Sequence, residues 1–163
     1  MLNEKDMLFL KRAVELAKIS LDKGDEPFGS VLVSKDGRIL YEGHNEVSSG
    51  DHTRHPELEI ARWAANNMTQ EERSEATVYT SNEHCPMCAA AHGWVGLGKI
   101  VYAASSKQLS DWLTEFGATP ARVNTLPIGE VIKDTIVVGP VLEFSELIKS
   151  YHKENYLRNK KSL

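Results

Sequence analysis

The sequence has few cysteines, no long apolar run and no excess of positive charge, and each shortage excludes a class of protein. Two of the 163 residues are cysteine, too few for a disulfide-stapled scaffold. No apolar run approaches the roughly 18 residues of a membrane span. Hydrophobic residues make up 41% and charged residues 26%, a balance that excludes a disordered chain. The length predicts one domain over residues 1–163, with a C-terminal helix and tail over 143–163.

The charge is acidic overall but unevenly distributed. The formal net charge is −4, which gives the whole chain no electrostatic attraction for nucleic acid. Residues 144–163 hold five Lys or Arg and two Glu, a net charge of +3, which leaves −7 on the first 143 residues. The N-terminal residues carry acids early and have no small-residue cleavage site, which indicates a helix rather than a signal peptide. We therefore expect a cytoplasmic protein with no membrane partner.

The hydrophobic pattern predicts helices that alternate with strands. Apolar residues at helical spacing predict a helix over 4–22, and two β-rich runs around Asp36-Gly37 predict a hairpin. The hairpin strands are expected at 29–33 and 38–43, further strands at 76–80, 100–103 and 135–138, and further helices at 56–66, 86–95, 108–116 and from about 144 onward. This order favours an α/β sheet covered on both faces, with parallel pairs among the later strands.

Two short motifs carry the candidate chemistry, His55-Pro56-Glu57 and Cys85-Pro86-Met87-Cys88. The cysteines stand where a helix begins, and free N–H groups and the helix dipole stabilise thiolates there. Their spacing lets both sulfurs reach one metal ion about 2.3 Å away, and His55 opens the preceding helix as a possible third ligand. Three ligands leave a position for water, whose proton an acid such as Glu57 can accept. A redox-active CxxC is the alternative, and the upstream His-Pro-Glu motif favours the metal.

Together these motifs resemble the zinc-dependent deaminases of nucleobases and nucleosides, whose signature is H-x-E followed by P-C-x-x-C. The resemblance runs from about Pro27 to Ala103, through PFGSVLV, EGHNEV, HPELEIARWA, VYTSNEHCPMC and KIVYAA in order. It implies a three-layer α/β/α fold of the cytidine deaminase type, with a five-stranded mixed sheet. It also implies zinc (Zn²⁺) bound by His55, Cys85 and Cys88, Glu57 as proton shuttle, and a homodimer.

Two positions near the motifs complicate the assignment. His84 stands where the family has proline, and as a fourth ligand it would close the site and leave a structural zinc. Glu59 lies near the face of His55 on helical geometry, since residues i and i+4 are about 40° apart, whereas Glu57 does not. Periodicity alone therefore favours Glu59 as ligand or base, and an ion pair with Arg62 is its structural alternative. The resemblance favours Glu57.

The same resemblance implies four substrate-contacting residues: Asn45, Phe28, Trp94 and Tyr156. In the family, an asparagine at the position of Asn45 hydrogen-bonds the substrate ring or ribose. Guanine deaminases place a tryptophan at the position of Trp94, and their C-terminal segment covers the active site and carries an aromatic, for which Tyr156 is the candidate. The Asp-rich segment of those enzymes is absent, and TEFGATPA stands in its place.

We therefore expect a zinc-dependent hydrolase that deaminates a nucleobase or nucleoside, with a free purine such as guanine preferred. The alternative enzyme converts adenosine to inosine in tRNA, using the basic last helix to contact phosphates; we rank tRNA below a small molecule as partner, because a solvated helix face explains the same lysines and arginines. The alternative from another class is a non-catalytic zinc-stabilised fold closed by His84.

Overall fold

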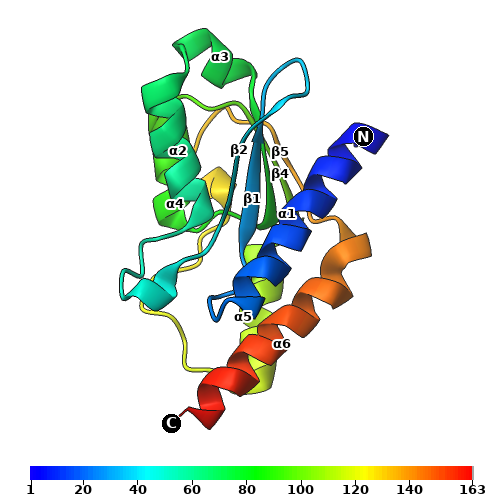
Figure 1. Cartoon of the computed structure of the whole chain (residues 1–163), viewed down its shortest axis with the longest axis vertical. Helices are drawn as coiled ribbons and strands as arrows, with labels where there is room; N and C mark the ends of the chain where they lie inside the picture. Colours follow the sequence, from blue (N-terminus) through cyan, green and yellow to red (C-terminus); the bar gives the residue numbers. More distant parts are fainter. Residues whose placement is uncertain (163) are drawn as a thin grey trace.

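The computed structural model describes residues 1–162 and consists of one five-stranded mixed sheet between two layers of helices (Figure 1). The strand order is β2-β1-β3-β4-β5. Both neighbours of β1, the strands β2 and β3, pair with it antiparallel, whereas the β3–β4 and β4–β5 pairs are parallel. The predicted three-layer α/β/α class is confirmed. Among the described residues, no helix is both long and apolar enough to cross a membrane.

The elements follow one another in the predicted alternation. The strands are β1 (Gly29–Val33), β2 (Ile39–His44), β3 (Thr77–Asn82), β4 (Lys99–Ala104) and β5 (Val137–Val138). The helices are α1 (Glu4–Asp22), α2 (Pro56–Asn67), α3 (Gln70–Glu75), α4 (Pro86–Trp94), α5 (Ser106–Phe116) and α6 (Ser145–Lys161).

Helices α1, α5 and α6 cover one face of the sheet, where α1 and α6 run side by side (Figure 1). The apolar residues that predicted α1 are buried there, including Leu10, Ala13 and Val14. Gly29 fixes the closeness of α1 to the first strand, because a Cβ at this position would lie 2.4 Å from the carbonyl oxygen of Ala13. The opposite face is covered by α2 and α4. The first turn of α2 contacts β1 and β3 through Glu57, and α4 follows β3 in the chain.

The structure corrects three details of the predicted elements. A short helix, α3, was missed, although Thr69 and Glu72 form a capping box at its start. The last predicted strand contracts to the two residues of β5. The C-terminal segment, predicted as a helix followed by a tail, is helical as far as Lys161. The hairpin is as predicted, with Gly37 in the left-handed conformation (φ +84°) that its turn requires.

Candidate metal centre and proton-transfer site

Two helix starts bring the candidate ligands together. His55 caps α2 and Cys85 caps α4; both residues are extended, and each is followed by a proline at the first helical position. Proline suits that position because it lacks the N–H that a helix start leaves unpaired. Cys88 lies one turn into α4 and is fully buried. The first turns of two packed helices therefore present an imidazole and two thiols to one point.

The three donor atoms have the spacing that one tetrahedral ion requires. Nδ1 of His55 lies 3.5 Å from the Sγ atoms of both Cys85 and Cys88, and the two sulfurs are 3.5 Å apart. Bonds of about 2.1–2.3 Å to a zinc ion at the centre place such donors roughly 3.5–3.8 Å apart. In the described chain these three residues form the one group of three His, Cys, Asp or Glu side chains close enough to share an ion. The donor set of one nitrogen and two sulfurs fits zinc.

The electrostatics of the cluster favour a thiolate at Cys85. Its hydrogen bond with Cys88 and the neighbouring His55 ring lower the pKa of the Cys85 thiol to about 4, against the opposing effect of burial. The same sulfur–sulfur contact and burial raise the pKa of the Cys88 thiol. The hydrogen bond with Cys85 raises the pKa of His55. The pair therefore holds one negative charge that a cation stabilises.

Glu57 is a buried carboxylate in the first turn of α2. The hydroxyls of Ser30 on β1 and Thr80 on β3 each lie 2.7 Å from its Oε1 atom. Burial raises the pKa of Glu57, and the two hydroxyl contacts oppose that shift. The carboxylate is close enough to the cluster to raise the pKa values of both His55 and Cys88. A carboxyl group with a raised pKa beside a metal centre is suited to accept and return a proton.

Glu59 lies outside this arrangement. Its carboxylate pairs with Arg62 at 3.3 Å on the half-exposed side of α2, the structural alternative considered for it. Helical periodicity misled here because His55 is the N-cap, with φ −94° and ψ 139°, and its side chain does not follow the helical spiral. A two-residue step from an extended cap into the first turn turns Glu57 toward the sheet.

His84 does not join the three donors. It is buried against His92 with the ring centroids 5.4 Å apart, and neither of its ring nitrogens has a hydrogen-bond partner among the described residues. Burial lowers the pKa of His84 well below its usual value, so the ring is neutral. His84 therefore lies outside the donor group, which consists of His55, Cys85 and Cys88.

The predicted substrate residues divide into two pairs. Asn45 and Phe28 lie together, because the Asn45 N–H donates to the Phe28 carbonyl at 3.0 Å, and the Asn45 side chain is buried. The next residue after Asn45 donates its N–H to the carbonyl of Arg54, which precedes His55. Trp94 is the last residue of α4 and is 91% exposed, about 13 Å along the helix axis from the cap. Tyr156 stacks on Phe116 with ring centroids 6.0 Å apart, so it rests on α5. Within one chain the structure brings neither Trp94 nor Tyr156 to the cluster.

Two acidic residues near the site were missed by the sequence analysis. Glu83 accepts from the backbone N–H groups of Ser106 and Ile128, both at 2.8 Å, and so fixes the start of α5 and the loop before β5 beside the β3–α4 turn. Glu26 lies in the α1–β1 loop with Oε2 3.4 Å from Nδ2 of Asn45. Neither belongs to a spaced motif; the position of Glu83 two residues before Cys85 was the one available signal.

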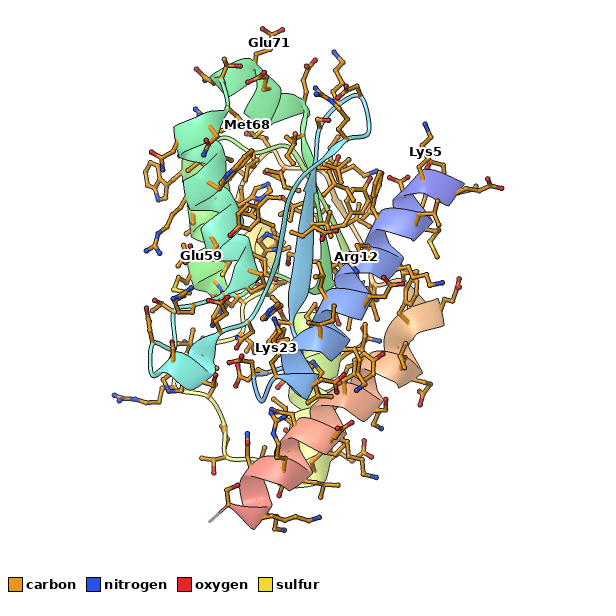
Figure 2. The ribbon with its side chains drawn as sticks, viewed as in Figure 1. Lys5, Arg12, Lys23, Glu59, Met68 and Glu71 are labelled. Carbon is orange, nitrogen blue, oxygen red and sulfur yellow. The ribbon has the colours of Figure 1, made fainter. Side chains whose placement is uncertain are left out.

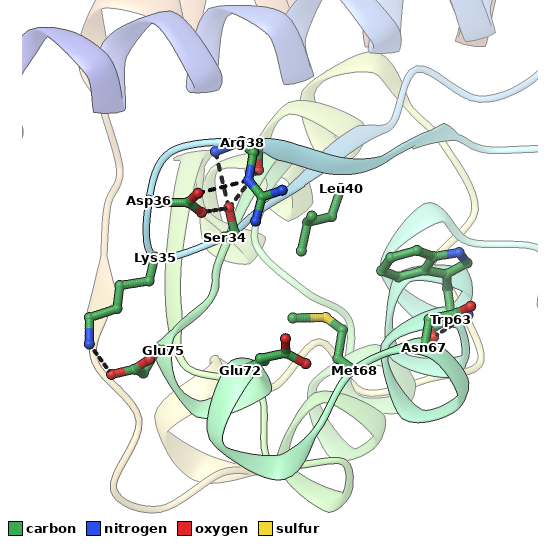
Figure 3. Close-up of a pocket in the computed structure, with 10 residues that line it drawn as sticks. All are labelled: Ser34, Lys35, Asp36, Arg38, Leu40, Trp63, Asn67, Met68, Glu72 and Glu75. Carbon is green, nitrogen blue, oxygen red and sulfur yellow. Dashed lines mark hydrogen bonds and ion pairs between the residues drawn. The ribbon is translucent and has the colours of Figure 1, made fainter.

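A separate pocket lies at the other end of the sheet (Figure 3). It has a volume of about 190 Å³ and lies between the β1–β2 turn and the segment that joins α2 to α3. Trp63, Met68 and Leu40 supply its apolar wall, and charged side chains surround it. In the described chain, none of the predicted site residues lines this pocket.

Comparison with known proteins agrees with this site. Residues 3–104 match the cytidine and deoxycytidylate deaminase zinc-binding region. A probable cytosine deaminase of Schizosaccharomyces pombe is 30% identical over 149 residues, which cover 90% of this chain and 91% of that protein. The guanine deaminase of Bacillus subtilis is 36% identical over 131 residues, covering 76% and 83% of the two chains. A solved structure from studies of A-to-I editing by tRNA:A34 deaminases superposes with a TM-score of 0.64 at 26% identity, covering 87% and 99%.

The fold, the site and these similarities define a hydrolytic deaminase. The chain belongs to the cytidine and deoxycytidylate deaminase family, because the family model matches more than half of its length. The resemblance found in the two sequence motifs is thereby confirmed.

Proposed function

We propose that this enzyme removes the amino group of a free nucleobase or nucleoside by zinc-dependent hydrolysis, with a purine such as guanine as the preferred substrate. The observation that carries the proposal is that a buried carboxylate, Glu57, lies within electrostatic reach of a cluster of three metal-binding residues. Three protein ligands are typical of catalytic zinc, since structural sites have four.

His55, Cys85 and Cys88 would hold the zinc ion. When bound, zinc acts as a Lewis acid that lowers the pKa of a water molecule toward about 7. Glu57 accepts the proton of the attacking water, since its pKa is raised by burial and its Oε1 is held by Ser30 and Thr80. It delivers that proton to the ring nitrogen. It then takes the second proton, from the hydroxyl formed on the attacked ring carbon, and passes it to the amino group, so that the C–N bond breaks, ammonia leaves and the carbonyl forms. Ser30 and Thr80 keep the carboxylate in one rotamer through this transfer.

Four residues are proposed to contact the substrate, with unequal support. Asn45 and Phe28 are supported by their chain neighbours, since Glu46 donates its N–H to the Arg54 carbonyl and Ser30 contacts Glu57. Trp94 and Tyr156 remain predictions from the resemblance, because in one chain each lies away from the cluster. The homodimer stays a prediction, and sedimentation of the purified protein tests it. The cytoplasmic location also stays a prediction.

The preference for a purine is supported by the identity of 36% to the guanine deaminase of B. subtilis. The similarity to a probable cytosine deaminase over 90% of the chain makes cytosine the base to compare first. Both similarities concern enzymes named for free bases, which supports a free base over a polynucleotide.

A tRNA adenosine deaminase is the second candidate, since a structure from work on tRNA:A34 deaminases shares the fold. The basic residues of α6 weaken this candidate, because two of them are engaged within the chain. Lys149 pairs with Glu115 at 2.7 Å, and Arg158 donates to the carbonyls of Leu21 and Asp25 at 2.7 and 3.0 Å. Fewer cations are then free to contact phosphates.

A screen for ammonia release tests the proposal. The zinc-loaded enzyme is incubated with guanine, adenine, cytosine, their nucleosides and a tRNA anticodon stem-loop, and a chelator-treated sample is the control. We expect release from a free base, with guanine fastest, and none after chelation. Inosine formation in the stem-loop with no release from any free base would favour the tRNA enzyme. No release from any of these compounds would contradict the proposed function.

A further inference from the structure

Glu26 is a half-buried carboxylate with little hydrogen bonding from the protein. Among the described residues, the one side chain that donates to it is Asn45, whose Nδ2 lies 3.4 Å from its Oε2. A carboxylate in water or in a satisfied site accepts several hydrogen bonds, and this one accepts a single long bond. The side chain is only partly buried, and its Oε1 atom has no hydrogen-bond partner among the described residues. Glu26 therefore has an accessible acceptor with no assigned role.

The backbone holds Glu26 firmly beside Asn45. The Ser20 hydroxyl lies 2.6 Å from the carbonyl oxygen of Glu26 and 3.1 Å from that of Asn45, so it bridges the two segments. The N–H of Phe28 donates to the Glu26 carbonyl at 2.9 Å. These contacts fix the position of the Glu26 backbone in the segment just before β1.

Asn45 is oriented by its neighbours. Its Oδ1 accepts from the Val47 N–H at 3.0 Å, which assigns the other end of the amide as the donor. One Nδ2 hydrogen points toward Glu26, and the second has no partner among the described residues. Glu26 thereby fixes which group Asn45 presents, and the two side chains together offer one donor and one acceptor.

The charge of Glu26 belongs to the same site. It interacts with His55 at the metal centre and with His52 in the loop before it, and burial raises its pKa. The His55 pKa is raised in part by Glu26, which places the two groups within electrostatic reach. In the described structure no lysine or arginine pairs with Glu26. A negative charge within electrostatic reach of the metal centre attracts N–H and O–H donors and repels phosphate.

We propose that Glu26 is a specificity-determining residue that accepts a hydrogen bond from an uncharged free base, holds the Asn45 amide in place, and disfavours substrates that carry a phosphate. This inference rests on the proposed deaminase function and narrows its substrate class. A free base offers a ring N–H where a nucleotide carries its sugar phosphate, so the acceptor at Glu26 favours the former. The resemblance did not indicate Glu26; its isolated carboxylate in the structure does.

Binding measurements on Glu26→Gln test the proposal without relying on turnover. The zinc-loaded Glu57→Gln protein serves as a non-turning background, and calorimetry gives the Kd for guanine and guanosine 5′-monophosphate, and for cytosine and cytidine 5′-monophosphate. Adding Glu26→Gln removes the charge and keeps the shape. Glu46→Gln is the matched control, because Glu46 lies next to Asn45 in sequence and pairs instead with Arg54.

We expect Glu26→Gln to shift the ratio of base to nucleotide affinity about tenfold toward the nucleotide in at least one pair, since a charge-assisted hydrogen bond is lost and a repulsion is removed. Glu46→Gln should leave both ratios within about twofold. Ratios that stay within twofold in both pairs for Glu26→Gln would overturn the inference. The ammonia screen fails independently: a shifted ratio with no ammonia from any compound would keep Glu26 as a binding determinant and reject the deaminase function.

Discussion

The two ends of α2 differ in the burial of their ionisable groups: these are largely buried at the first turn and exposed in ion pairs at the far end. Figure 2 labels Glu59 near the first turn and Met68 at the far end of this helix. At the first turn, Glu57 and Cys88 are buried, His55 and Cys85 are half-buried, and no lysine or arginine of the described chain forms an ion pair with Glu57. At the far end, around the pocket of Figure 3, charged side chains pair with one another at the surface, Arg38 with Asp36 at 2.7 Å and Lys35 with Glu75.

This comparison distinguishes the candidate metal centre from the surface pocket of Figure 3. Burying an ionisable group costs free energy unless a partner or a metal compensates it. The first turn of α2 bears that cost, and a bound cation would offset it. The exposed pairs at the far end are solvated, and such pairs contribute little to stability. A pocket by itself therefore does not mark function here; uncompensated buried charge does.

Removal of a ligand is expected to have the largest effect. Cys88→Ala should abolish zinc binding and activity, and it should also lower the free energy of unfolding, because a metal that binds only the folded chain adds its binding energy to stability. Zinc content by atomic emission and denaturant unfolding measure both. Met87→Ala, on the same turn but outside the cluster, is the control and should keep about one zinc per chain. Retention of full zinc by Cys88→Ala would refute the ligand assignment.

The next effect is expected at the contact between α6 and the loop that carries Glu26. Arg158 donates to the Leu21 and Asp25 carbonyls, so Arg158→Ala should loosen this loop. We expect the free energy of unfolding to fall by about 1–2 kcal/mol and KM to rise several-fold with kcat little changed. Lys153→Ala, exposed on the same helix, is the control. Unchanged KM in Arg158→Ala would mean that α6 does not support the site through this loop.

Deletion of residues 154–163 tests in a second way whether the end of α6 supports the site. It removes both Arg158 and Tyr156, the predicted aromatic cover, and we expect slower turnover of a free base with zinc retained. If Tyr156→Ala reproduces the loss and Arg158→Ala does not, the predicted cover acts directly at the pocket. The present contacts of Tyr156 with Phe116 favour Arg158 as the cause.

A smaller effect is expected in the pH dependence of stability. His152 on α6 is buried between Phe28 and Trp112, and burial lowers its pKa to about 3. An unfolded histidine titrates near 6.5, so below that pH the unfolded chain binds the proton and the folded chain does not. Stability should therefore fall as the pH decreases from about 6.5 toward 3, by up to about 1.4 kcal/mol per pH unit for this residue. Unfolding at several pH values should show a shallower fall in His152→Phe; an unchanged slope would contradict the assignment.

The smallest effect is expected at the pocket of Figure 3. Arg38→Ala breaks the exposed pair with Asp36 and should change the free energy of unfolding by less than about 0.5 kcal/mol. Activity should be unaffected, since this pocket lies at the other end of the sheet. A loss of activity with normal stability would show that the two ends are coupled and would break the comparison.

Much of this molecule could be predicted from local patterns. The period of α1, the Asp36-Gly37 turn and the paired motifs placed the helices and strands close to their observed bounds, because burial on one face and turn geometry are local properties. The donor cluster could also be expected, since two capped helix starts depend on the sequence around His55 and Cys85.

Other features depend on packing between distant segments. Glu26 meets Asn45 only through the pairing of β1 with β2, and no spacing in the sequence relates them. The contact of Tyr156 with Phe116 is set by the angle at which α6 crosses α5, and the exposure of Trp94 by the end of α4. The choice between Glu57 and Glu59 required the extended backbone of His55, which helical periodicity does not describe.

The most direct test of the account is ammonia release by Glu57→Gln beside Glu59→Gln. The two glutamates are two residues apart on one helix, and the account assigns proton transfer to the buried one alone. Both variants should retain about one zinc per chain. On the best free base found in the screen, Glu57→Gln should lose roughly 10²–10⁴-fold in kcat, whereas Glu59→Gln should stay within about twofold of the unmodified enzyme. Substantial turnover by Glu57→Gln, with loss in Glu59→Gln, would contradict the account.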